Sequence, residues 1–140
     1  MLKVTVICVG KLKEKYLTDA CSEYAKRLSG YVSLQITEVF DDDALINKIK
    51  QKDFVIALDV CGRQMTSEEF SDFIEKSMFT HSSFAFIIGG SDGFSAKVLQ
   101  RADYRLSFSK MTFPHQLMRV IFLEQLYRAF KIMKGEVYHK

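Results

Sequence analysis

Three glycines lie within five positions of the segment FIIGGSDGFS, residues 86–95, between an apolar run and a serine suited to starting a helix. Glycines placed after a strand and before a helix let a ligand approach the bare backbone, as in pyrophosphate-binding folds. Here the spacing is GGxxG rather than GxGxxG, and no Lys-Ser or Lys-Thr pair follows as a P-loop requires. Because Asp92 would add a negative charge beside a bound phosphate, the segment disfavours a phosphate-bearing cofactor.

A ligand for this loop must approach the backbone closely, lack phosphates and tolerate a carboxylate. S-adenosylmethionine meets these conditions, because its sulfonium group is cationic. The pair Asp92-Gly93 is also a common turn sequence, and glycine adopts positive φ without any ligand. The loop by itself therefore leaves a ligand site and a simple turn open.

A second segment, LSFSKMTFPHQLMRV at residues 106–120, contains the sole proline, Pro114, in a polar loop that follows a predicted strand. Open α/β sheets bind ligands at the carboxyl ends of their strands. Thr112 or Phe113 is expected to cap the next helix, with Pro114 in its first turn, where a missing N–H is harmless. We expect the backbone of this segment to face the same crevice as the glycine loop.

His115 and Arg119 are four positions apart and are expected to share one helix face. Arg119 interrupts the apolar run LMRVIFL, residues 117–123. A buried or interfacial arginine needs a carboxylate, phosphate or carbonyl partner, so functional and structural interpretations of Arg119 stay open. Because apolar residues surround this helix, we also expect a subunit interface along it.

The carboxyl terminus places Tyr138, His139 and Lys140 in the last three positions. A frayed end is the simplest interpretation of such a tail. A tyrosine can nonetheless stack on a base, a histidine can move a proton and a lysine can hold a phosphate. If the terminus is held in place, these residues are candidates for contacting a substrate.

The elements that position these residues alternate between apolar runs and segments of helical period, which predicts an α/β fold. We expect one domain over residues 1–140, with a mostly parallel sheet of five or six strands and helices on both faces. The predicted strands are 3–9, 32–39, 54–60, 84–89 and 104–109, and the predicted helices are 14–29, 43–51, 67–79, 95–101 and 114–133. Thr66 and Glu69 have the spacing of a capping box, and Ser95 is a candidate helix cap.

The composition fits one soluble domain of 140 residues, with 48% hydrophobic and 26% charged residues. A net charge of +3 permits a polyanionic partner without requiring one. The three cysteines lack CxxC or Cys/His ligand spacing, so we expect a reducing cytoplasm with neither a disulfide framework nor a metal site. No apolar run approaches about 18 residues and no cleavable leader is recognisable, so we expect neither secretion nor a membrane span.

Four stretches carry a resemblance to a known family: VICVGKLKEKY, IIGGSDGFS, LSFSKMTFPHQLMRVIFLEQLYRAFKI and the closing YHK. They are similar to the ribosomal RNA large-subunit methyltransferase H family, within the SPOUT class of knotted methyltransferases. The resemblance runs essentially end to end and is most specific over residues 84–140. It implies an α/β domain whose carboxyl-terminal part forms a trefoil knot, with S-adenosylmethionine bound by the knot loops at a homodimer interface.

The resemblance also implies an activity, because family members methylate N3 of a pseudouridine in a decoding-centre stem loop of large-subunit rRNA in assembled ribosomes. By motif, the cofactor contacts are Leu58, Gly89, Phe108, Ser109, Lys110, Met111, Thr112 and Phe113. The candidates for RNA binding are His115, Arg119, Tyr138, His139 and Lys140, with the tail supplied across the dimer. His115 or His139 is the candidate acceptor of the N3 proton, and Arg119 is expected to stabilise charge on the ring or to anchor a phosphate.

One departure from the family lies between Phe40 and Asp53, where members carry a considerably longer loop and helix. The shortening removes surface that can contact the ribosome, so it bears on the substrate more than on the chemistry. Two alternatives remain open: a non-catalytic module that binds RNA or the ribosome, and a methyltransferase of the same class that acts on tRNA.

Overall fold

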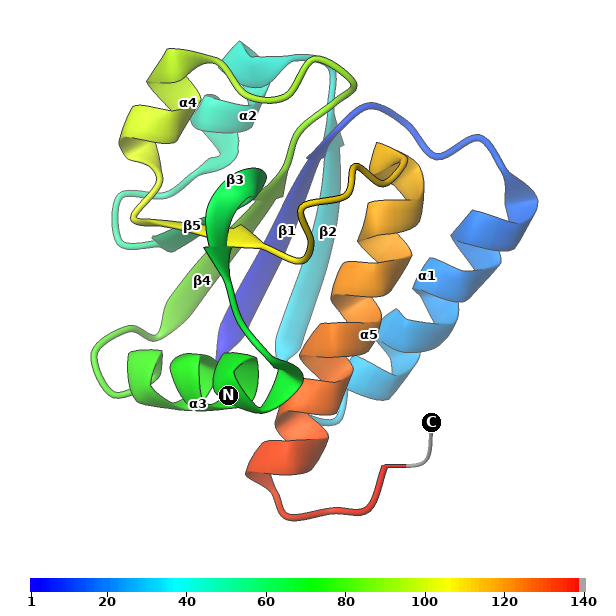
Figure 1. The fold of residues 1–140 in the computed structure, drawn as a ribbon, viewed down its shortest axis with the longest axis vertical. Helices are drawn as coiled ribbons and strands as arrows, with labels where there is room; N and C mark the ends of the chain where they lie inside the picture. The colour runs from blue at the N-terminus through cyan, green and yellow to red at the C-terminus, as the bar shows by residue number, and fades with distance from the viewer. Residues whose placement is uncertain (139–140) are drawn as a thin grey trace.

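The computed structural model describes residues 1–138, in which five strands alternate with five helices (Figure 1). The strands are β1 (Lys3–Val9), β2 (Ser33–Val39), β3 (Phe54–Gln64), β4 (Ser83–Ile88) and β5 (Tyr104–Ser107). The helices are α1 (Lys15–Leu28), α2 (Asp42–Lys48), α3 (Ser67–Ser77), α4 (Ala96–Arg101) and α5 (His115–Met133). The strand order is β2-β1-β4-β3-β5 and each neighbouring pair is parallel, so the predicted α/β class is confirmed with five strands.

Helices cover both faces of the sheet, as predicted. On one face α5 packs against α1 and α3, and on the other face α2 contacts α4 (Figure 1). Successive side chains of a strand point to opposite faces. In β4, Phe84 and Phe86 therefore enter the core beneath α5, whereas Ala85 and Ile87 enter the core beneath α2 and α4. The trefoil knot stays a prediction from the resemblance.

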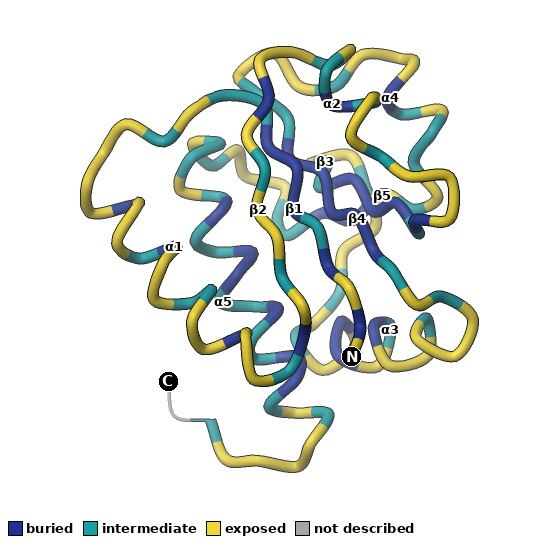
Figure 2. Tube along the Cα trace, turned by 180° about the vertical axis from the view of Figure 1, so that it is seen from behind, coloured by how far each residue is buried: buried dark blue, intermediate teal, exposed yellow. Residues whose placement is uncertain are grey.

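The burial of each strand follows its place in the sheet. The central strand β4 is almost completely buried, whereas most residues of the edge strand β2 are exposed (Figure 2). This agrees with the sequence, because strands covered on both faces have nearly continuous apolar runs. The helix α5 is apolar on several sides because α1, α3 and the sheet all contact it, so neighbours within the chain account for much of that pattern.

The helix caps follow the predictions for α3 and α4 but not for α5. The Glu69 N–H donates to Thr66 Oγ1 at 3.0 Å and the Thr66 N–H donates to Glu69 Oε1 at 2.8 Å, which completes the capping box of α3. The Val98 N–H donates to Ser95 Oγ at 3.3 Å at the start of α4. The expected cap of α5 at Thr112 or Phe113 is wrong, because Pro114 itself occupies the cap position and its side chain accepts no hydrogen bond.

The three cysteines are free thiols that differ in accessibility. Cys8 and Cys21 are buried, whereas Cys61 is exposed. Burial raises the pKa of the Cys8 thiol to about 12 and also raises the pKa of Cys21. Across residues 1–138, no helix is both long and apolar enough to cross a bilayer, and no cluster of three or more potential ligands is arranged for a metal ion.

Candidate active site

The carboxyl ends of β3, β4 and β5 surround a cavity of about 580 Å³. Ligands bind at this edge in open parallel sheets, and the volume is within the range of about 300–1,000 Å³ that is usual for small-molecule pockets. The walls come from the end of β3, from the loop that follows β4 and from the loop that joins β5 to α5. Three segments that are far apart in the chain thus meet at one place.

Of the eight residues predicted to contact S-adenosylmethionine, seven line this cavity. They are Leu58, Gly89, Phe108, Ser109, Met111, Thr112 and Phe113. The eighth, Lys110, is exposed and does not belong to the lining. Asp92 lines the cavity as well, so a carboxylate is present where the sequence suggested a cationic ligand.

The glycine loop folds back on itself in a tight turn. Gly93 has a φ of 73°, and its N–H donates to the Gly90 carbonyl at 3.1 Å. A Cβ on Gly89 would lie 3.1 Å from the Gly93 carbonyl oxygen, so even alanine there would require the loop to shift by a few tenths of an ångström, and a larger side chain would require more. The expected turn at Asp92-Gly93 is confirmed, and it presents backbone to the cavity.

The loop between β5 and α5 is held by its own hydroxyl groups and by aromatic packing. The Ser107 hydroxyl donates to the Ser109 carbonyl at 2.9 Å, and the Met111 N–H donates to Ser109 Oγ at 3.0 Å. The Phe108 ring packs 6.1 Å from Phe70 and 6.3 Å from Phe122, centroid to centroid. These contacts hold the loop against the core. The predicted strand 104–109 is too long, because β5 ends where these turns begin.

The end of β3 bulges away from β5 and forms a wall that the sequence analysis missed. Their register shifts between Leu58 and Arg63, and β3 ends at Gln64 rather than at the predicted residue 60. A Cβ on Gly62 would lie 2.7 Å from the Arg105 carbonyl group, so only glycine fits this close approach. The residues that line the cavity as a result are Asp59, Val60, Cys61 and Arg105. A glycine inside a strand is the signal for such a bulge.

A second cavity, of about 560 Å³, lies on the β1 and β2 side of the glycine loop. Because β4 is the central strand, its loop separates this cavity from the first one. Residues 90–94 and His115 line both cavities. His115 is the first residue of α5, and its Nε2 is 4.0 Å from the position that a Cβ on Gly10 would take. His115, the predicted proton acceptor, therefore lies at the junction of the two cavities.

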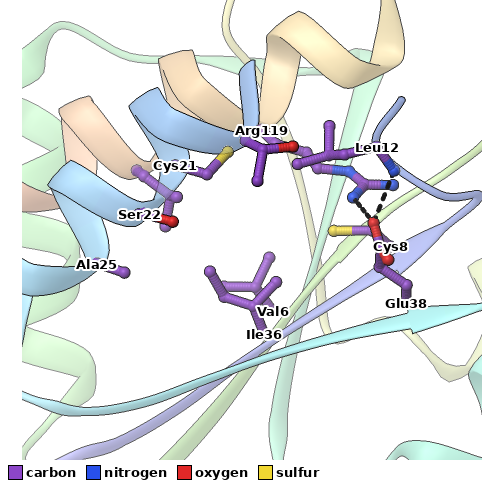
Figure 3. A pocket seen from close by; sticks show the side chains of 11 residues that line it. Val6, Cys8, Leu12, Cys21, Ser22, Ala25, Ile36, Glu38 and Arg119 are labelled. Carbon is purple, nitrogen blue, oxygen red and sulfur yellow. Dashed lines mark hydrogen bonds and ion pairs between the residues drawn. The ribbon is translucent and has the colours of Figure 1, made fainter. Parts of the chain in front are cut away.

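Arg119 is buried, with 3% of its surface exposed, and its partners come from its own chain. Its Nη1 donates to Glu38 Oε2 at 2.5 Å (Figure 3). Its Nη2 donates to the Gly10 carbonyl at 2.7 Å. Within residues 1–138 its Nε has no partner. The carboxylate and the carbonyl expected for a buried arginine are therefore present, and Glu38 is a residue that the sequence analysis missed.

Glu38, on β2, connects that strand to α5 through Arg119 and to the loop after β1 through Leu12. Its Oε2 also accepts the Leu12 N–H at 2.8 Å, and it lines a separate cavity of about 380 Å³ between α1, α5 and the sheet (Figure 3). Burial would raise the pKa of Glu38, but hydrogen bonds from Leu12 and Arg119 outweigh burial and lower the pKa below its ordinary value. The carboxylate is therefore held ionised against Arg119.

Gln116, in the first turn of α5, holds the loop after β1. Its Nε2 donates to the Lys11 carbonyl at 3.1 Å, and its Oε1 accepts the Lys13 N–H at 3.3 Å. Both lysines have exposed side chains. Gln116 and Arg119 together fix a basic loop beside His115.

The tail lies at the other end of α5 (Figure 1). The Tyr138 hydroxyl donates to Glu124 Oε2 at 2.9 Å, and the Arg128 guanidinium lies 4.5 Å from the centre of the Tyr138 ring. Its partner Glu124 is nine residues along α5 from His115, roughly 14 Å at about 1.5 Å per residue, so the structure does not bring Tyr138 into contact with His115 within one chain. His139 and Lys140, also predicted to act, lie outside the described residues.

Residues 2–139 match a family model described as "Predicted SPOUT methyltransferase". The chain therefore belongs to the SPOUT methyltransferase family. Relatives from Carboxydothermus hydrogenoformans (48% identical), Clostridium beijerinckii (50%) and Clostridium botulinum strain Kyoto (51%) are each named "Ribosomal RNA large subunit methyltransferase H". Each alignment covers 99% of this chain and 100% of the relative, which confirms the resemblance to that family within the SPOUT class.

The alignments with these relatives run over 159 positions, whereas the chain has 140 residues, so the relatives are longer. Among solved structures, a probable methylase family protein from Haemophilus influenzae has a TM-score of 0.65 at 13% identity, covering 100% of this chain and 72% of that chain. A TrmH/SpoU tRNA modifying enzyme from A. aeolicus has a TM-score of 0.56 at 12% identity, covering 96% and 78%. At these identities the likeness concerns the fold alone.

Proposed function

We propose that this chain transfers a methyl group from S-adenosylmethionine to large-subunit rRNA, at N3 of a pseudouridine in a decoding-centre stem loop, on assembled ribosomes in the cytoplasm. The observation that carries the proposal is the convergence of seven predicted cofactor residues on one cavity of about 580 Å³. Relatives that are 48–51% identical and are named rRNA large subunit methyltransferases support the choice of substrate.

The cavity suits S-adenosylmethionine in shape and charge. Apolar side chains such as Leu58, Phe108 and Phe113 provide a surface for the adenine ring, and the glycine loop provides backbone groups at close range. Asp59 and Asp92 contribute carboxylates to the lining, which favour the cationic sulfonium. When bound, the cofactor supplies an electrophilic methyl group.

The protein's contribution to the transfer is alignment and proton removal. The loops after β4 and β5 would hold S-adenosylmethionine in the first cavity, and His115 lies at the junction of the first and second cavities. His115 would accept the N3 proton of the acceptor base, directly or through one water, as the methyl group supplied by the cofactor is transferred to N3. Arg119 acts through Gly10 and Glu38, which hold the junction in place.

A second copy of the chain completes the site in this proposal. Because the Tyr138 hydroxyl is bonded to Glu124, nine residues along α5 from His115, its own chain does not supply it to the junction. A homodimer in which each tail reaches the partner's cavity would bring Tyr138, His139 and Lys140 to the RNA. Size-exclusion chromatography with light scattering measures whether the chain is a dimer.

Methyl transfer from radiolabelled S-adenosylmethionine to purified ribosomes tests the function directly, with free large subunits and tRNA as parallel substrates. We expect label in the large-subunit rRNA of assembled ribosomes, at one pseudouridine identified by mass spectrometry. Label in tRNA would replace the substrate assignment, and absence of label with all three substrates would favour a binding module without catalysis.

The location of the cofactor is tested separately with Cys61. This exposed thiol lines the proposed cofactor cavity, whereas Cys8 and Cys21 are buried. We expect S-adenosylmethionine to slow alkylation of Cys61 by at least tenfold at saturation, and a Cys61→Ser variant to retain binding by calorimetry. Calorimetric binding without protection of Cys61 would move the cofactor to another cavity.

The identity of the base is tested by replacing each histidine alone. His115→Asn is expected to lower kcat by on the order of a hundredfold, in the range that is usual for loss of a general base. His139→Asn provides the comparison from the tail. Retained rates in both variants would exclude a histidine base and leave alignment as the main contribution.

A further inference from the structure

The second cavity is lined in part by an almost fully exposed phenylalanine, Phe40. Phe40 follows β2 and lines this cavity together with the glycine loop and His115, yet 92% of its surface is exposed. A phenylalanine that is so exposed contributes little to the core, so its place at a cavity rim is the informative feature.

The turn that carries Phe40 is held at both following residues. The Asp41 carboxylate accepts the Ala44 N–H at 2.9 Å and so caps α2. The Asp42 carboxylate accepts the Ser95 N–H at 2.6 Å, which ties the turn to the end of the glycine loop. Phe40 is therefore presented from a fixed backbone on the opposite side of the glycine loop from the cofactor cavity.

We propose that this second cavity receives the acceptor nucleobase of the RNA, with the Phe40 ring stacked on the base. This inference rests on the proposed function and adds a substrate subsite to it. Enzymes that modify a base take it out of its stack, and an aromatic side chain replaces the lost stacking. The base would then lie beside His115, with the methyl donor across the same junction.

The charges around the cavity suit a base better than a phosphate. Asp41, Asp42 and Asp92 line it, so a phosphate group would be repelled whereas the N–H groups of a uracil-like ring would find acceptors. The phosphates of the same strand have cations nearby, because the exposed Lys11 and Lys13 belong to the loop that Gln116 holds next to His115. Carboxylates thus line the cavity proposed for the nucleobase, whereas the lysines that would contact phosphates lie outside it.

Phe40→Ala tests the subsite, with Phe79→Ala as a matched control. Phe79 is 84% exposed and lies between α3 and β4, near the amino ends of the strands, whereas Phe40 follows the carboxyl end of β2. In methyl transfer to ribosomes at saturating S-adenosylmethionine, we expect Phe40→Ala to lower kcat/KM by roughly tenfold to a hundredfold, the usual effect of removing one base-stacking ring. Phe40→Tyr retains the ring and is expected to restore most of the rate, whereas Phe79→Ala stays at the wild-type rate.

A crosslink gives a second measure that does not depend on the rate. With a photoreactive phenylalanine analogue at position 40, we expect crosslinks to nucleotides at or next to the methylated position, and none there from position 79. If Phe40→Ala matches Phe79→Ala in kcat/KM, or if position 40 crosslinks no RNA near the methylated nucleotide, the subsite is wrong. Those results require an active wild-type protein, so they are distinct from a failure of the proposed function, in which the wild type itself labels no rRNA.

Discussion

The two ends of α5 each hold an arginine against a glutamate, but they do so in different ways. Near the cavities, Arg119 is buried and reaches Glu38 and Gly10, which come from other elements. Near the tail, Arg128 pairs with Glu124 one turn away on the same helix, and each of these side chains is 19% exposed. Glu124 and Arg128 have the four-residue spacing of a surface ion pair on a helix, but here the pair is partly buried.

The two arginines differ in how many elements of the chain their contacts bring together. Contacts of Arg119 span more than 80 residues of sequence and lock the start of α5, the loop after β1 and the end of β2 together. Contacts of Arg128 and Tyr138 stay within the last part of the chain and place an aromatic ring beside a cation along the second half of α5. The first region holds the proposed reaction site within one chain, whereas the second reaches a cavity only in the proposed dimer.

The largest expected effect concerns the tail acting across a dimer. Removing residues 138–140 is expected to lower methyl transfer by about a hundredfold or more, since it removes groups that align or deprotonate the substrate. Gly89→Val, which forces the glycine loop open, is expected to abolish cofactor binding. Co-expression of the two variants is the informative measurement, because a mixed dimer contains one intact cavity facing one intact tail.

Activity in the co-expressed pair, with little in either variant alone, is the expected result. The mixed dimer would be purified with two different affinity tags, so that each homodimer serves as its own control. Absence of activity in a stable mixed dimer would mean that the tail does not act in trans.

The next largest effect is on stability. Glu38→Ala leaves the buried Arg119 guanidinium without its carboxylate, and because the Glu38 side chain is 36% exposed we expect a loss of about 2 kcal/mol in the free energy of unfolding, less than for a fully buried pair. Glu124→Ala removes the corresponding partner of Arg128, which has more access to water, and we expect about 1 kcal/mol. Urea unfolding followed by circular dichroism measures both values. Equal losses would show that the two ends are held alike.

The pH dependence of stability sharpens the same contrast. The folded protein holds the pKa of Glu38 below its ordinary value of 4.5, so the ionised carboxylate stabilises the fold above that pH. This contribution is lost as the pH falls from about 4.5 through the lowered pKa. In thermal unfolding between pH 7 and pH 3, we expect wild type to lose more stability than Glu38→Gln. A parallel decline in both proteins would contradict the role of Glu38.

The smallest expected effect concerns the charge in the glycine loop. Asp92→Asn removes a carboxylate from the lining of the cofactor cavity while it keeps the turn residue type. We expect binding of cationic S-adenosylmethionine to weaken by about threefold, as for an exposed charge pair. Binding of the neutral S-adenosylhomocysteine is expected to stay unchanged in the same calorimetric titrations. An equal loss for both ligands would point to the loop's shape rather than its charge.

Local patterns predicted most of the elements and many residues of the candidate site. The alternation of apolar runs and helical segments predicted the order of strands and helices, and the motifs at residues 86–95 and 106–120 indicated two loops at one edge of the sheet. The extension of β3 was missed, because it depends on a close approach between Gly62 and Arg105 that no local propensity expresses. The cap of α5 was placed too early, because Pro114 itself has a non-helical ψ of 132° and the first helical residue is His115.

By itself the sequence determined the α/β class, the family and which segments carry glycines, aromatics and titratable side chains. These properties depend on residue type and short spacing, which a linear chain displays directly. Only the tertiary structure decided that Glu38 and Gly10 are the partners of Arg119, that His115 stands between two cavities and that Phe40 lies at the rim of one of them. Each of these facts concerns residues from elements that are far apart in the sequence. Their proximity arises from the strand order and from the packing of α5 against the sheet.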